Sequence, residues 1–286
     1  MSDELISIFN TQVIPLGLMA IMFSLGLSLQ IADFGRLLAR PKSAGIGLCG
    51  QLILLPALAF LLVSVFQLPA AMAVGLLILA ACPGGVTSNA LVFAARGDVA
   101  LSVTLTACSS LLTIISTPLI IGFGIHHFYP EGDAPQLDVV MTVKKLLQMA
   151  IIPIALGMIL RHFNTQLAEK LVGYLRPTSM LVLVLVIGFS VFVSLDLVLD
   201  NLRQAGPVAY LLNLLAMAMG LGLALLFQLN KGEQFTLAVE VGVQNATMAT
   251  FLSLSVLNDW NLAIVPTIYG VIMLLNASIL MRWLKR

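Results

Sequence analysis

The stretch LAVEVGVQNATMATFLSLSVL, residues 237–257, has the apolar composition of a membrane-buried helix, yet it contains Glu240, followed by Gln244 and Asn245. A charged side chain in the hydrocarbon core of a bilayer is costly unless it is paired or coordinated, so it is a functional candidate by default. The alternative is a protonated structural glutamate that donates a hydrogen bond. A partner or ligand that neutralises the Glu240 carboxylate is therefore expected, and the other polar residues of the chain indicate which kind.

The composition of the whole chain indicates a polytopic membrane protein. Of its 286 residues, 60% are hydrophobic and 9% are charged, whereas about 25% of the residues of an ordinary soluble domain are charged. At about 20 residues for each span, this length allows about nine or ten spans and no sizeable soluble domain. We therefore expect a single transmembrane domain, residues 1–286, in contact with the lipid bilayer and without a nucleic-acid partner.

The N-terminal sequence and the cysteines predict neither processing nor cross-linking. MSDELISIFN lacks the basic region and the cleavage site of a signal peptide, so we expect the first apolar segment to stay in the mature chain. Cys49, Cys82 and Cys108 lie in apolar segments without CxxC spacing, and neither a disulfide framework nor a zinc site is expected.

Apolar runs separated by short polar segments predict an all-α fold of about nine transmembrane helices. The polar segments at 161–177 and 201–207 are among those expected to connect spans. The spans are expected near residues 11–31, 43–66, 70–94, 99–125, 139–160, 178–197, 207–228, 234–257 and 261–281.

The basic residues predict the orientation. Of 14 Lys and Arg, only Lys144, Lys145 and Arg203 fall in one set of alternate loops, which leaves eleven on the other side. Because cytoplasmic loops are enriched in Lys and Arg, we expect a cytoplasmic C-terminus, an external N-terminus and a plasma (inner) membrane location. The eleven are Arg36, Arg40, Lys42, Arg96, Arg161, Lys170, Arg176, Lys231, Arg282, Lys285 and Arg286.

A second interrupted helix is predicted in the third span, which contains ACPGGVTSNALVFAARGD, residues 81–98. Pro83, Gly84 and Gly85 should break the helix and leave backbone groups unpaired. The segment GGVTSNAL resembles VGVQNATM of the eighth span, and the two spans run in opposite directions. Opposed, interrupted helices are typical of inverted-repeat transporters with a site near the bilayer midplane.

Polar residues near these interruptions suit a monovalent cation. Ser102, Thr106 and Ser109 share one face of the fourth span, although such hydroxyls often bond to a carbonyl of the preceding turn. Gln51 is an isolated polar residue in the second span. One carboxylate with several neutral oxygens favours a monovalent ion over calcium. Sodium is the leading prediction, and a proton carried by Glu240 is the alternative.

The segments CPGGVTSN, ARGDVALSVTLT and EVGVQNA, in this order, resemble the bile acid:sodium symporter family, and the likeness extends from about Leu16 to the C-terminus. The resemblance implies symport of an organic anion by alternating access, with a core domain moving against a panel domain. It also implies repeats of four and five helices, about residues 11–127 and 138–286, without the first span of ten-span bacterial members. No cofactor is implied besides two coupling sodium ions.

The resemblance further implies two sodium sites that share one carboxylate. On this interpretation Glu240 stays ionised because two ions neutralise it. The first site comprises Ser88, Asn89, Ser102, Thr106 and Glu240, and the second comprises Gln51, Glu240, Gln244 and the carbonyls of Val241 and Val243.

The substrate is less closely defined by the resemblance. Family members offer an organic anion the N-termini of the half-helices, a hydroxyl after the glycine pair and the asparagine of the QN pair. Here Asn245 is present, whereas Val86 takes the hydroxyl position beside Thr87, and Leu275 takes the place of a histidine before Asn276. These departures leave Thr87, Asn245 and Asn276 as expected contacts of a bile-salt-like anion or a small carboxylate.

Three other functions remain as alternatives. A proton-coupled or arsenite-type carrier of related architecture could use Cys82 as a soft ligand together with Glu240. A channel could use the polar lining, although two opposed broken helices suit alternating access better. An intramembrane enzyme is not expected, because the spans contain no paired aspartates, HExxH or GxGD motif.

Overall fold

The computed structural model describes residues 3–39, 41–130 and 134–284, and every regular element in this part of the chain is helical. The predicted all-α fold is therefore confirmed. Seven candidate membrane spans are long and apolar enough to cross a bilayer. They are Glu4–Ser28, Pro41–Phe66, Val99–Phe128, Val139–Phe163, Thr165–Val193, Leu195–Leu226 and Trp260–Leu280.

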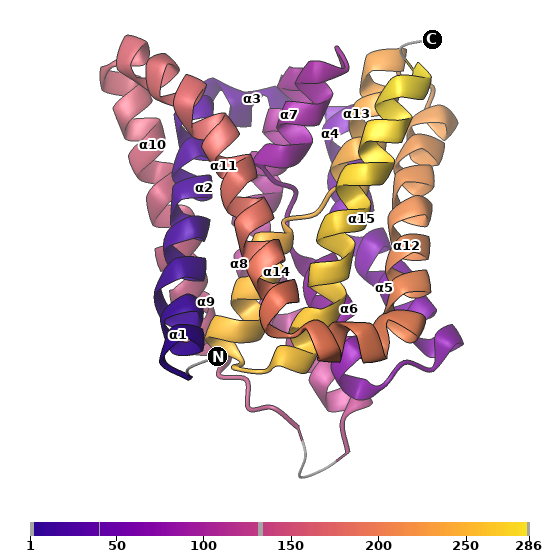
Figure 1. The fold of residues 1–286 in the computed structure, drawn as a ribbon. Helices are drawn as coiled ribbons and strands as arrows, with labels where there is room; N and C mark the ends of the chain where they lie inside the picture. The colour runs from indigo at the N-terminus through magenta and orange to yellow at the C-terminus, as the bar shows by residue number, and fades with distance from the viewer. Residues whose placement is uncertain (1–2, 40, 131–133, 285–286) are drawn as a thin grey trace.

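Two further expected spans, 70–94 and 234–257, each consist of shorter helices on either side of an extended link. Gly84 and Gln244, one in each link, form an isolated antiparallel bridge, and the Asn245 N–H donates to the Pro83 carbonyl at 3.0 Å. The links therefore cross in contact, near the centre of the molecule in Figure 1. The count of nine crossings stays a prediction. The helices are α6 (Ala70–Ala81), α7 (Val86–Ala94), α13 (Lys231–Gly242), α14 (Ala246–Phe251) and the π-helix η4 (Leu252–Val256).

Other helices flank this crossing on both sides. In Figure 1, α2 and α10 lie to the left and α5, α12, α13 and α15 lie to the right, whereas α11 runs from the upper left to the lower centre. Their bounds are α1 (Asp3–Ile8), η1 (Phe9–Val13), α2 (Ile14–Ser28), α3 (Ile31–Ala39), α4 (Pro41–Cys49), η2 (Gly50–Leu54), α5 (Leu55–Phe66), α8 (Val99–Phe128), α9 (Val139–Leu146), η3 (Leu147–Ile151), α10 (Ile152–Phe163), α11 (Thr165–Val193), α12 (Leu195–Leu226) and α15 (Trp260–Leu284).

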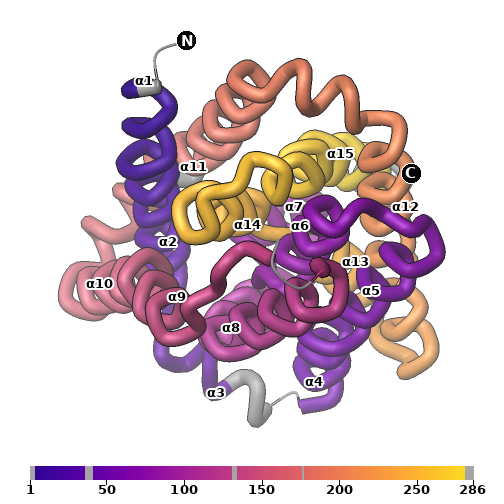
Figure 2. The backbone as a smooth tube through the Cα atoms, turned by 90° about the horizontal axis from the view of Figure 1, so that it is seen from below, coloured from indigo at the N-terminus to yellow at the C-terminus, as the bar shows by residue number. Residues whose placement is uncertain are grey.

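Close backbone contact joins α2 to α10. A Cβ atom on Gly157 would lie 2.5 Å from the carbonyl oxygen of Phe23 and 2.6 Å from the Leu27 nitrogen. Small residues allow membrane helices to approach in this way, and the packing between the helices then depends on van der Waals contact. Figure 2, seen from below, shows α2 and α10 as neighbours beside the helices of the crossing.

Two segments that were expected to be loops are helical instead. Most of residues 161–177 belongs to α11, which is capped where the Asn164 side chain accepts the Leu167 N–H at 2.9 Å. Residues 201–207 lie within α12. The loop prediction was wrong because both segments contain strong helix formers. Their prolines, Pro177 and Pro207, are also tolerated inside membrane helices when the freed carbonyls find other partners.

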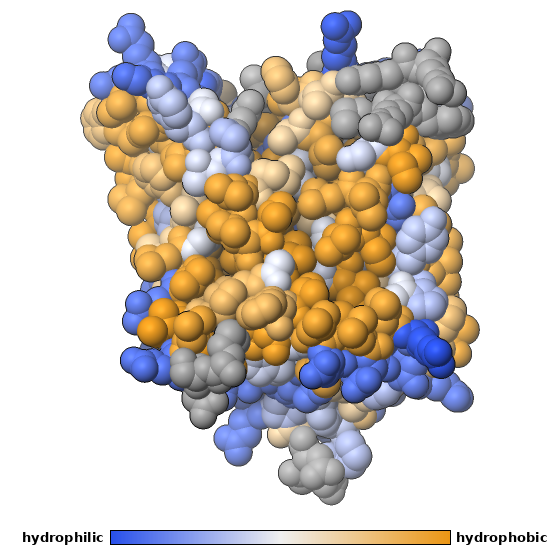
Figure 3. Space-filling model, in the orientation of Figure 1, coloured by the Kyte–Doolittle hydropathy of each residue, from blue (hydrophilic) through white to orange (hydrophobic). Residues whose placement is uncertain are grey.

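The surface has the layered polarity of a membrane protein. Figure 3 shows a broad hydrophobic band with hydrophilic residues at the upper and lower edges. The start of α1 lies at the lower edge and the end of α15 at the upper edge (Figure 1). Of the basic residues used to predict orientation, Arg40, Lys285 and Arg286 lie outside the described residues.

Candidate functional site

Glu240 lies one turn before the break in the second interrupted helix, and the residue is 3% exposed. Its Oε1 accepts a hydrogen bond from Ser102, and its Oε2 accepts one from the Thr106 hydroxyl at 3.0 Å. Ser102 and Thr106 are one turn apart on α8 and share a face, as their spacing predicted. Ser109 instead donates to the Thr106 carbonyl at 3.2 Å. Two of the three hydroxyls on this face thus reach the buried carboxylate.

The first half-helix pair adds oxygens to the same place. Asn89 Oδ1 lies 2.6 Å from the Ser102 hydroxyl oxygen and 3.3 Å from the Thr106 hydroxyl oxygen, so each hydroxyl can donate its one proton either to Asn89 or to Glu240. The Ser88 hydroxyl donates to the Gly85 carbonyl at 2.8 Å. Ser88 and Asn89 are buried at the start of α7, directly after the break. The structure therefore gathers side chains from α7 and α8 around a carboxylate carried by α13.

Gly84 leaves the space on which these oxygens converge. A Cβ atom at this position would lie 2.7 Å from Glu240 Oε2 and 3.5 Å from each of the Ser88 and Thr106 hydroxyl oxygens. A residue without a side chain is needed where backbone approaches a site this closely. A cluster of one carboxylate with hydroxyl and amide oxygens has the hard-oxygen chemistry that suits a small cation.

A second polar pair, Gln51 and Gln244, lies beside the links. Gln51 Nε2 donates to Gln244 Oε1 at 2.6 Å, and Gln244 Nε2 donates back to Gln51 Oε1 at 3.2 Å. Gln51 also donates to the Cys82 carbonyl at 2.9 Å, and Gln244 donates to the Val241 carbonyl at 2.8 Å. Val243 lies in the extended link that ends α13. Residues that are 193 positions apart in the sequence thus meet beside the two breaks.

The two groups are not joined through Glu240 by a direct hydrogen bond. Within the described part of the chain, the hydrogen bonds of the Glu240 side chain go to the first group, and Gln51 and Gln244 bond to each other and to backbone. The bridging role of Glu240 between two ions stays a prediction.

A small pocket lies where α7 and α14 begin, and its lining includes Thr87, Ser179 and Asn245. Asn245 Oδ1 accepts the Met248 N–H at 3.0 Å and so caps α14. Its Nδ2 is buried and has no hydrogen-bond partner among the described residues. A buried donor without an acceptor is uncommon in folded proteins. No side chain caps the start of α7, so this amide donor and the first N–H groups of that helix together suit an anionic oxygen.

Asn276 does not line this pocket and belongs to a different network. Its Nδ2 donates to Asn213 Oδ1 at 2.8 Å, and both Asn213 Nδ2 and the Tyr269 hydroxyl donate to the Gly242 carbonyl at 2.7 Å. This network satisfies the last carbonyl of α13 at the break. Asn213 was missed by the sequence analysis, although it is an isolated amide in an apolar span, the same signal that identified Gln51.

The thiol proposed for soft-ligand chemistry stands alone. Cys82 is buried at the end of α6. Throughout the described residues, no group of three or more His, Cys, Asp or Glu is placed to hold a metal ion. The oxygen-rich clusters, rather than the thiol, are the concentrated chemical feature of the crossing.

Comparisons with known proteins agree with this picture. The model of the Sodium Bile acid symporter family matches residues 15–201. The "Uncharacterized sodium-dependent transporter YocS" of Bacillus subtilis is 33% identical over 237 residues, which are 82% of this chain and 71% of the relative. The human "Ileal sodium/bile acid cotransporter" is 28% identical over 97% of this chain and 80% of its own length. The rice "Probable sodium/metabolite cotransporter BASS2, chloroplastic" is 27% identical over 97% of this chain and 65% of its own length.

Proposed function

Because the chain belongs to the sodium bile acid symporter family, we propose that it carries an organic anion into the cytoplasm by sodium-coupled symport with alternating access. It is a membrane transporter of this family and not an enzyme. The observation that supports the proposal best is the crossing itself, where an oxygen cluster around Glu240 lies next to a pocket with an unpartnered amide donor on Asn245.

We propose two sodium sites at this crossing. In the first, Na⁺ enters the space beside Gly84, and the hydroxyl protons that now point at the carboxylate turn away so that the oxygens face the ion. The second forms when the reciprocal Gln51–Gln244 pair opens and both amide oxygens turn to Na⁺. Its members are Gln51, Glu240, Gln244 and the carbonyls of Val241 and Val243. The first comprises Ser88, Asn89, Ser102, Thr106 and Glu240.

The coupling follows from the shared backbone at the crossing. Gln244 would contribute to the second ion site, and the next residue, Asn245, lines the anion pocket and has a buried amide nitrogen without a partner among the described residues. An ion that sets the position of the link also sets the position of the amide donor and of the α7 start. Sodium would therefore increase affinity for the anion, and by linkage the anion would increase affinity for sodium.

The movement for alternating access would occur between two groups of helices. We propose that α2, α10 and α11 form the panel and that the helices around the crossing form the core. The small pocket lies at their boundary, since its lining comes from α7 and α14 on one side and from Ile21 and Leu183 on the other. On this proposal the repeats comprise about residues 11–127 and 138–286.

A thermal-shift screen of organic anions tests this function. We expect carboxylates or sulfonates, from small acids to bile salts, to raise the melting temperature of the purified protein in sodium and not in potassium. Asn245→Asp keeps an oxygen that can cap α14 but replaces the free amide with a like charge. This variant should lose the shift caused by the anion and keep its own melting temperature within a few degrees.

The result separates the proposed function from its alternatives. Stabilisation by the same anion in potassium at low pH would indicate proton coupling through Glu240. An arsenite-specific effect that depends on Cys82 would indicate the soft-ligand carrier. An anion response that Asn245→Asp leaves unchanged would contradict the position of the substrate site.

The proposed orientation is tested separately from transport. From the excess of basic residues on one side, a reporter fused after Arg286 should be cytoplasmic, and one fused before Met1 should be external. The opposite faces occupied by the start of α1 and the end of α15 support this expectation. Finding both reporters on the same side would contradict nine crossings and the four-plus-five repeat.

A further inference from the structure

A larger cavity, of about 660 Å³, lies away from the crossing, between the α2–α3 connection and the junction of α10 with α11. It shares no lining residue with the pocket at the crossing. Its walls include Met158 and Ile159, and its rim carries Ile31 and Phe163, which are 74% and 81% exposed. The cavity therefore combines an apolar wall with an opening bordered by large apolar side chains.

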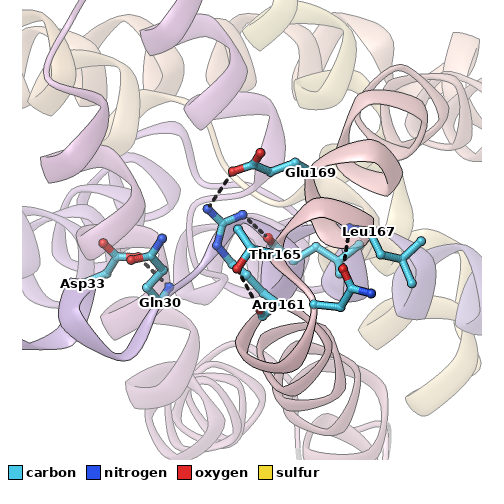
Figure 4. Close-up of polar contacts among 8 residues, drawn as sticks. Gln30, Asp33, Arg161, Thr165, Leu167 and Glu169 are labelled. Carbon is cyan, nitrogen blue, oxygen red and sulfur yellow. Dashed lines mark hydrogen bonds and ion pairs between the residues drawn. The ribbon is translucent and has the colours of Figure 1, made fainter.

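Arg161 brings a positive charge to this lining, which also contains the polar residues Gln30, His162 and Thr165. Arg161 Nη1 donates to the Leu27 carbonyl at 3.0 Å, and Nη2 lies 3.7 Å from the Glu169 carboxylate. Its Nε is buried and has no hydrogen-bond partner in the part of the chain that the structure describes. Figure 4 shows the guanidinium extending from α10 toward Glu169, with the α2–α3 connection beside it.

The ion pair with Glu169 does not neutralise this guanidinium effectively. The Arg161 side chain is 17% exposed, whereas that of Glu169 is 65% exposed. An exposed carboxylate at 3.7 Å is screened by water and holds its partner weakly. The half-buried arginine thus keeps an attraction for a second anion, and His162 adds another polar group to the lining.

The place of the cavity in the molecule determines the kind of anion. The α10–α11 junction stands at the upper edge in Figure 1, where the hydrophobic band of Figure 3 meets the hydrophilic rim. A ligand at this level can place a charged head at Arg161 and an apolar chain along Ile159 and Phe163. Basic pockets between membrane helices on the cytoplasmic side suit the head groups of anionic lipids.

We propose that this cavity binds an acidic phospholipid, whose phosphate contacts Arg161 and whose acyl chain covers the apolar wall formed by Met158, Ile159 and Phe163. The lipid would hold the α2–α3 connection against the end of α10, because these two segments form opposite walls of the cavity. The inference goes beyond the transport site, and its test needs neither sodium nor a substrate.

Binding is measured on the purified full chain by native mass spectrometry with phosphatidylglycerol and with phosphatidylcholine as the probes. We expect selective retention of phosphatidylglycerol. Arg161→Gln should weaken its binding roughly fivefold to tenfold, because a basic residue near a lipid head group and a charge-assisted hydrogen bond are both lost. Lys170→Gln is the matched control, since Lys170 is a basic residue of α11 that does not line the cavity.

A second variant leaves Arg161 in place, so its result does not depend on whether Arg161→Gln folds. Glu169 is exposed, so Glu169→Gln should fold normally, and by removing the competing carboxylate it should tighten phosphatidylglycerol binding about twofold to threefold. Unchanged binding in Glu169→Gln, or equal retention of both lipids, would overturn the proposal. Displacement by glycerol 3-phosphate as effective as by short-chain phosphatidylglycerol would also overturn it and indicate a soluble-anion site.

Discussion

Glu240→Gln is expected to reduce sodium-driven uptake about 100-fold or more, with little loss of folded protein. The substitution keeps the shape of the side chain and removes the charge that two sodium ions are proposed to share. Removing one partner from a buried charged cluster costs about 3 to 5 kcal/mol. The fold should tolerate the change, because the hydroxyls of Ser102 and Thr106 can donate to the new amide oxygen or accept from its nitrogen.

The measurement is uptake into proteoliposomes with external sodium or external potassium, normalised to the amount of folded protein. Thr106→Ala is the comparison, since it removes one neutral oxygen from the first site and leaves the carboxylate. It should raise the half-saturating sodium concentration rather than end transport. If Glu240 were a protonated structural residue, Glu240→Gln would leave sodium-driven uptake unchanged, because glutamine resembles a protonated glutamate. Sodium-driven uptake that persists in Glu240→Gln would exclude the shared-ligand proposal.

Uptake of a monovalent anion is expected to carry net positive charge inward and to support accumulation of several thousandfold. The reason is that two oxygen clusters occur at the crossing, whereas the anion pocket offers one free amide donor. A roughly tenfold sodium gradient is worth about 1.4 kcal/mol for each ion, and one charge crossing about 100 mV gains about 2.3 kcal/mol. One sodium ion per monoanion is electroneutral and supports only about tenfold accumulation. Two sodium ions per monoanion provide about 5 kcal/mol, from the two ion gradients and the one net charge that crosses the membrane.

Proteoliposomes at a fixed sodium gradient and a varied potassium diffusion potential distinguish these cases. An inside-negative potential should accelerate uptake, and the dependence of the rate on sodium should be sigmoidal. Gln244→Leu removes the side chain of the link that hydrogen-bonds to Gln51. This variant should show a hyperbolic dependence of the uptake rate on sodium, because the first site stays intact. Voltage-independent uptake with hyperbolic sodium dependence in the unmodified protein would contradict two coupled ions and leave the glutamine pair a structural role.

Much of the candidate site could be predicted from the sequence because the membrane makes polar residues informative. In an apolar span, Glu240 and Gln51 have few reasons to be present other than a ligand or a polar partner. The same argument identified Ser102 and Thr106, whose spacing places them on one face. It failed for the segments 161–177 and 201–207, because polarity there marks the end of a hydrophobic stretch and not the end of a helix.

The sequence by itself determined the all-helical membrane fold, the family and the two breaks, since each depends on local chemistry: apolar length, proline and glycine, and polar residues in an apolar run. Only the tertiary structure decided which polar groups meet. It joined Gln51 to Gln244 and kept both apart from the Glu240 hydroxyl cluster, and it placed Asn276 in a network with Asn213 instead of in the anion pocket. The helix rotations and the crossing of the two links decide these contacts, and they arise from packing between segments far apart in the chain, which no local pattern specifies.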